Sequence, residues 1–160
     1  MQIEMKPGLP VGAFQQTIVL TTNLKDLATL DVPIRGTIVS DVKVSGHGYD
    51  DEKGMLSLGA VSGKEGIERQ LRIIVRGPHA KDVKFEPIEI EPSILVVKVG
   101  KTVPMGGSVT QTLLTIEVPK GSPPADYFGS EGGKVGRIRL KTGHPQSPEV
   151  KIFVRFVVEG

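Results

Sequence analysis

Apolar and polar residues alternate along most of the chain, which is the period-two pattern of half-buried β-strands. The pattern is clear around Ile18 and Leu20, and again around Leu71 and Ile73. No window keeps the i, i+3, i+4, i+7 spacing of an amphipathic helix. We therefore predict an all-β chain, with strands at residues 2–6, 14–22, 30–39, 55–58, 68–76, 83–90, 94–99 and 110–118 and a final hairpin at 135–158.

The predicted strands are short and are separated by stretches rich in proline and glycine, of which the chain has 12 and 20. About seven strands lie between Met55 and Val158. This number and spacing are typical of an immunoglobulin-like antiparallel β-sandwich. Aromatic residues make up only 4% of the chain, and tryptophan and cysteine are absent. The core of the sandwich is therefore expected to be built from Val, Ile and Leu.

The closing hairpin is echoed near the beginning of the chain. Residues 136–143 (GRIRLKTG) resemble residues 16–23 (QTIVLTTN), and residues 150–156 (VKIFVRF) resemble residues 32–38 (VPIRGTI). The echo extends to residues 115–121 and 2–8. We interpret it as a tandem repeat whose first copy is truncated to its last three strands.

This interpretation divides the chain into a partial immunoglobulin-like unit at residues 1–45, a polar glycine-rich linker at 46–54 and a complete sandwich at 55–160. Segment 55–160 is expected to fold alone, whereas segment 1–45 is not, because three strands cannot form two layers. Two ways of covering its bare apolar face remain open. It either packs on the second unit or associates with the same segment of another copy.

Composition argues against several functional classes. The 20 basic and 18 acidic residues are mixed along the chain, without the basic patch and interleaved aromatics of a nucleic-acid binder. No apolar run is long enough to cross a bilayer, and we find no signal peptide in this chain. His47, His79 and His144 lie in three separate loops, without the short spacing of metal ligands or a catalytic motif. We therefore predict no catalytic residue, no bound metal and no cofactor.

Two loops carry weak candidates for binding. Asp50, Asp51 and Glu52 cluster carboxylates that a hard cation such as calcium prefers, although the alternation of an EF-hand loop is absent. The second candidate is the Pro/Gly-rich loop 119–133, where the candidate interaction residues are Pro123, Pro124, Tyr127 and Phe128.

Turn and core residues of the chain resemble those of a family of bacterial immunoglobulin-like domains of unknown function, related in style to the ASH and major-sperm-protein sandwiches. The residues that carry the resemblance are Leu56, Leu58-Gly59, Val61 and Gly63 at the opening, and Val118-Pro119, Phe128, Ile138, Leu140, Thr142-Gly143-His144-Pro145, Val150 and Ile152 at the close. Thr21-Thr22-Asn23 and Val32-Pro33-Ile34 with Gly36 look like the same ending. The resemblance implies an exported, periplasmic or extracellular bacterial protein of several domains, and no chemistry.

We accordingly expect a non-enzymatic structural or protein-interaction module, with a protein partner or self-association through strand edges. The alternative is a carbohydrate- or calcium-dependent binding domain that uses loops near Tyr49–Glu52 and Tyr127–Glu131.

Overall fold

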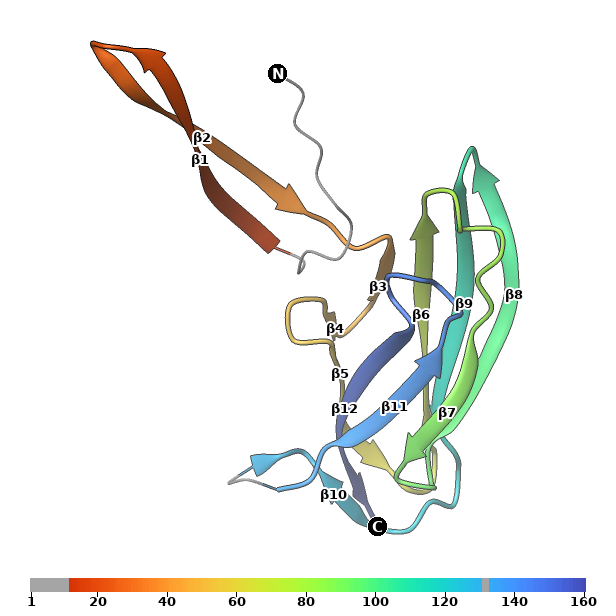
Figure 1. Ribbon diagram of the computed structural model, residues 1–160. Helices are drawn as coiled ribbons and strands as arrows, with labels where there is room; N and C mark the ends of the chain where they lie inside the picture. Colours follow the sequence, from red (N-terminus) through yellow and green to blue (C-terminus); the bar gives the residue numbers. More distant parts are fainter. Residues whose placement is uncertain (1–11, 131–132) are drawn as a thin grey trace. The chain divides into compact units, whose positions relative to one another are not determined.

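The computed structural model in Figure 1 describes residues 12–130 and 133–160. The chain divides into two units, Met1–Ser40 and Asp41–Gly160. The described part is built of strands and turns, and antiparallel sheets pack as a sandwich in the second unit. The predicted all-β fold is confirmed and is consistent with an immunoglobulin-like architecture. No helix in the described residues has the length and apolar character needed to cross a membrane.

The first unit contains one long hairpin. Strand β1 (Gly12–Leu24) pairs antiparallel with β2 (Leu27–Ile38), and Lys25 and Asp26 form the turn between them. The predicted strands 14–22 and 30–39 lie almost wholly within β1 and β2, but the loop predicted over residues 23–29 shrinks to this tight turn. The third predicted strand, residues 2–6, lies outside the described residues.

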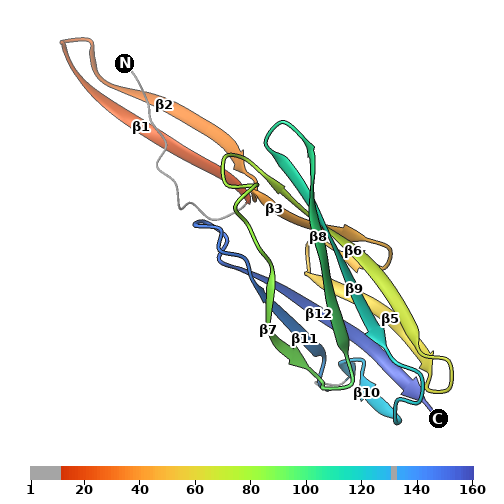
Figure 2. The same ribbon diagram turned by 90° about the vertical axis from the view of Figure 1, so that its right-hand side faces the viewer.

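The described residues of the second unit form ten strands, and Figures 1 and 2 show them in two layers. One sheet has the order β4 (Tyr49–Asp50), β5 (Met55–Ser62), β12 (Glu149–Glu159), β11 (Gly136–Lys141) and β7 (Glu86–Glu91), with β10 (Ala125–Tyr127) also pairing with β12. The other has the order β3 (Val42–Gly46), β6 (Ile67–Arg76), β9 (Val109–Val118) and β8 (Val96–Gly106). All pairings are antiparallel except that of β12 with β5.

The core lies between these two sheets and follows directly from the alternation in sequence. Every second residue of β9, β11 and β12, and of β6 from Leu71 onward, is buried, while its neighbours face outward. The buried cluster is mostly aliphatic, with Phe85 and Phe156 as its aromatic members. The predicted Val/Ile/Leu core is thus confirmed.

The structure divides the chain differently from the prediction made above. The second unit begins at Asp41 instead of residue 55, because β3 is an edge strand of the sandwich and Val44 is buried in its core. The expected linker 46–54 contains β4, which pairs with β5. The polar, glycine-rich composition of this segment reflects two turns. One lies at residues 47–48 between β3 and β4, and the other at residues 51–54 between β4 and β5.

Two other segments differ from expectation. The long turn predicted for residues 100–108 is mostly the end of β8, which remains paired with β9 as far as Gly106. The predicted loop 119–133 contains strand β10, which is too short to give a periodic signal.

Candidate interaction surfaces

One face of the β1–β2 hairpin carries mainly apolar side chains, with Gln16 as its polar member. Directly opposed residues of an antiparallel pair share a face, and the pairs Ile18 with Val32 and Leu20 with Leu30 place apolar side chains together. We call this the hairpin face; its members are Phe14, Gln16, Ile18, Leu20, Leu30, Val32, Ile34, Gly36 and Ile38. None of them is charged. Most are half-buried, and Leu30 remains 43% exposed.

Phe14 and Gly36 pack against each other on this face. A Cβ atom built on Gly36 would lie 2.5 Å from Cε1 of the Phe14 ring, so the ring lies across the glycine. Glycine weakens a strand unless something approaches it closely. Here the glycine accommodates an aromatic side chain from the opposite strand, which keeps the hairpin face apolar at the end near Gly12.

The opposite face of the hairpin has a different character. It carries Gln15, Thr17 and Thr21 from β1 and Asp31 and Arg35 from β2. All of these side chains are exposed, as is Val19 on the same face, at 59%. The hairpin is therefore an amphipathic ribbon whose polar side suits solvent and whose apolar side suits another apolar surface.

The predicted interaction loop is partly occupied by contacts within the sandwich. Tyr127 lies on β10, half-buried, with its ring stacked on Phe156 at a centroid distance of 5.4 Å. The guanidinium of Arg155 lies 4.4 Å from the centroid of the Phe128 ring, and its Nε donates a hydrogen bond to the Phe128 carbonyl oxygen. Pro123 and Pro124 are exposed. The four residues do not form one free recognition surface, because Tyr127 is turned into the sandwich.

The predicted cation loop lies at the turn between β4 and β5, and the carboxylates of Asp50 and Asp51 already have partners. Asp50 Oδ1 accepts hydrogen bonds from the backbone N–H groups of Glu52 and Lys53, and these bonds, led by that of Lys53, lower the pKa of the Asp50 carboxyl. The carboxylate of Asp51 pairs with Lys43 at 3.2 Å. Among the described residues, no three His, Cys, Asp or Glu side chains form a group that could hold a metal ion.

Tyr49 lies at the base of this loop and packs against the core. Burial, followed by the negative charges of Asp51 and Asp50, raises the pKa of its hydroxyl to about 12. The hydroxyl therefore stays protonated at neutral pH. We see no chemistry that this tyrosine and its neighbours would perform together.

Two of the three histidines meet in the fold, although their separation in sequence gave no sign of it. The rings of His79 and His144 make an edge-to-face contact with centroids 5.6 Å apart. His144 is buried, and its Nδ1 accepts a hydrogen bond from the Gln146 backbone N–H. Its Nε2 lies 3.6 Å from Asp41 Oδ2, beyond hydrogen-bond distance. The contacts of His144 with Asp41 and His79 link the β11–β12 loop to the start of β3 and to the segment after β6. We assign them a structural role.

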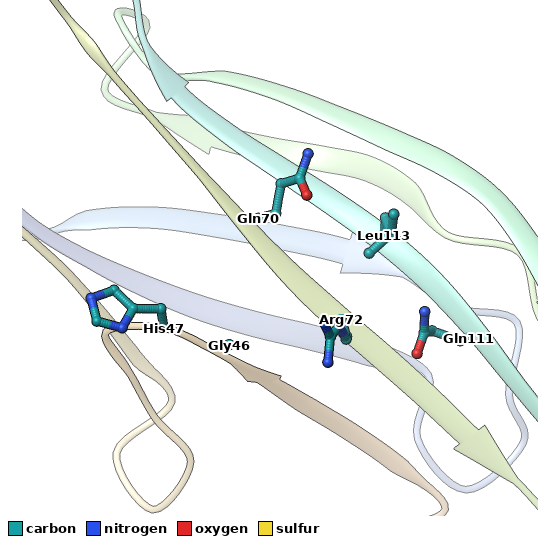
Figure 3. Close-up of a pocket in the computed structure, with 6 residues that line it drawn as sticks. All are labelled: Gly46, His47, Gln70, Arg72, Gln111 and Leu113. Carbon is teal, nitrogen blue, oxygen red and sulfur yellow. The ribbon is translucent and has the colours of Figure 1, made fainter.

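His47 lies elsewhere, beside a hollow of about 460 Å³ on the outer face of the four-stranded sheet (Figure 3). The hollow is lined by Gly46 at the end of β3, His47 directly after it, Gln70 and Arg72 on β6, and Gln111 and Leu113 on β9. It has no aromatic platform for a sugar ring and no paired carboxylates. None of the residues singled out in the sequence lies in it except His47.

Comparison of the chain with known protein families and with curated proteins found no match in either set.

Proposed function

We propose that this chain is a non-enzymatic structural or protein-interaction module of a larger, exported bacterial protein. The resemblance noted in the sequence supports the exported, periplasmic or extracellular setting. The interaction is assigned to the β1–β2 hairpin, with its strand edges and the hairpin face as the binding elements.

The observation that carries this proposal is the uncharged apolar face of a two-stranded ribbon. An isolated hairpin of two strands is marginally stable in water. Contiguous exposed apolar patches on soluble proteins mark surfaces that bind something. The hairpin face meets this description, since its members are apolar except for Gln16 and Leu30 is 43% exposed.

The edges of the ribbon add a second means of binding. In the described part of the chain, β1 pairs only with β2, so each strand has an outer edge with unpaired backbone groups. Such edges accept another strand by β-augmentation. A protein partner with an apolar strand or sheet face would satisfy both features at once.

Cysteine labelling tests whether the face is available, because the chain has no cysteine of its own. We would compare three single-cysteine variants of the full chain: Ile18→Cys on the hairpin face, Val19→Cys on the opposite face and Ile138→Cys in the core of the sandwich. In dilute solution, a maleimide should label the thiols at positions 18 and 19 at similar rates, and the thiol at position 138 far more slowly. Labelling at position 18 that is as slow as at position 138, at every dilution, would remove the hairpin face as a docking element.

A further inference from the structure

The geometry points to a second copy of this chain as the occupant of the hairpin face, with the two faces packed against each other about a twofold axis. This inference rests on the proposed function and names its partner. It is carried by the sequence echo between the two hairpins, by the absence of charge on the hairpin face and by the lack of another free apolar sheet face in the described residues.

The similarity between the two hairpin sequences indicates what kind of surface covers such a hairpin. Ile18, Leu20 and Ile34 correspond in the echo to Ile138, Leu140 and Ile152. In the sandwich these three counterparts are fully buried between the two sheets. The hairpin face thus has the composition of one half of a sheet-on-sheet interface, and its complement is an apolar sheet face lying about 10 Å away.

Within the described residues, a second copy offers one such face. The inner faces of both sandwich sheets are already buried against each other. The other exposed large apolar residues are scattered. They are Val19 on the opposite face of the hairpin, Leu24 and Leu27 beside its turn, and Val39, Ile88, Val103, Met105, Leu113 and Phe128 elsewhere. The hairpin face of the partner is therefore the extended apolar strand surface that remains.

Charge and size agree with this arrangement. The hairpin face carries no charged side chain, so bringing two copies together causes no like-charge repulsion. An isologous contact needs a self-complementary patch, and a flat apolar ribbon provides one. A 13-residue strand pair has a footprint on the order of 400 Å² per copy, from a rise of about 3.3 Å and a strand spacing of about 4.8 Å. Two such footprints amount to about 800 Å² in total, which is less than stable specific interfaces bury, so we expect a weak dimer that forms only at high concentration.

The experiment measures the mass of the full chain by sedimentation equilibrium over a wide concentration range. The wild-type chain should pass from one copy to two as concentration rises. Ile18→Lys and Leu30→Lys, which place a charge on the hairpin face, should remain single copies. The matched control Val19→Lys, on the opposite face, should dimerise like the wild type. Thermal unfolding in each variant would exclude misfolding of the sandwich, and an unchanged far-ultraviolet circular dichroism spectrum would show that the hairpin still forms, so that neither explains a lost dimer.

The thiol at position 18 gives a second readout. Its labelling rate should fall about tenfold or more once most of the chain is dimeric, because a closed interface excludes reagent. A chain that stays a single copy at high concentration, with position 18 still reactive, overturns the second-copy inference and leaves the proposed function standing. A dimer that is lost in Val19→Lys and kept in Ile18→Lys also overturns it. Slow labelling at every concentration overturns both.

Discussion

The β1–β2 and β11–β12 hairpins have related sequences but opposite environments. Both are antiparallel, and in both the apolar residues fall on one face. In β11–β12 these residues are fully buried, because β7 and β5 extend the sheet on either side and the second sheet covers it. In β1–β2 the corresponding residues are only half-buried.

The register of the two hairpins also differs. The β11–β12 pair joins Leu140 to Val150, whereas β1–β2 joins Leu20 to Leu30 instead of to Val32, the counterpart of Val150. The difference is two residues. A shift of two leaves every side chain on its original face, while a shift of one would reverse them. The local sequence therefore determines that a hairpin forms and that one of its faces is apolar. Whether that face is buried depends on whether another sheet packs against it.

The largest expected effect comes from removing parts of the sandwich edge. A chain of residues 41–160 should retain the unfolding midpoint of the sandwich in the full chain, because the hairpin belongs to a separate unit. A chain of residues 55–160 should be strongly destabilised or unfolded, since it lacks β3, β4 and the buried Val44. Circular dichroism during thermal unfolding measures both. Equal midpoints for the two truncated chains would mean that β3 and β4 contribute nothing to the sandwich.

A pair of matched substitutions compares the two hairpins directly. Ile152→Ala removes a fully buried side chain from β12 and should cost about 2–5 kcal/mol of the unfolding free energy of the sandwich. Ile34→Ala, at the corresponding position of β2, should leave that free energy nearly unchanged. Urea denaturation provides the comparison. A similar loss in both variants would show that the two units unfold as one.

The smallest expected effect concerns pH and the outer face of β11–β12. Arg139 contacts Glu149 through Nη2 and Oε1 and Glu89 through Nη1 and Oε2, each at 2.8 Å, and Arg137 also contacts Glu89. The hydrogen bonds from Arg139 are the main reason that the pKa values of Glu89 and Glu149 lie below their ordinary value of 4.5. A lowered pKa in the folded state adds stability above pH 4.5, and this contribution is lost as the pH falls below 4.5.

Arg139→Met should therefore reduce the loss of sandwich stability on acidification below pH 4.5. The effect should be small, because these side chains remain partly exposed and solvent screens their charges. Urea midpoints measured above and below pH 4.5 show how steeply the stability of the sandwich changes with pH in the wild type and in the variant. No ion pair involves β1 or β2 among the described residues, so a chain of residues 41–160 should show the same pH dependence as the full chain. Identical pH dependence in wild type and variant would rule out a role for the Arg139 contacts.

Much of the fold could be predicted because strands leave a direct periodic signal. The alternation at residues 68–76 and 110–118 correctly located β6 and β9, and the lack of aromatic residues correctly implied an aliphatic core. Strands β4 and β10 have two and three residues, respectively, which is too short for an alternating apolar and polar pattern to be recognised. The sequence 42–46 was assigned to the end of a first unit, since nothing local indicates that it pairs with β6.

The candidate sites also show that local features could be predicted from the sequence whereas long-range contacts could not. Clustered carboxylates at Asp50 and Asp51 were visible in the sequence, but their use in a turn and in an ion pair with Lys43 was not. Likewise, Tyr127 was read as part of a recognition loop, yet it stacks on Phe156, which lies 29 positions later in the chain.

Sequence alone determined where the longer strands such as β6 and β9 lie and which side of each is apolar, because this alternation depends on neighbours only a few positions away. The tertiary structure alone decided which apolar faces are covered. It brought β3 to β6, Tyr127 to Phe156 and His79 to His144, contacts between residues far apart in the chain that no local pattern encodes. The physical reason is that burial is a property of two surfaces, and each stretch of sequence describes only one of them.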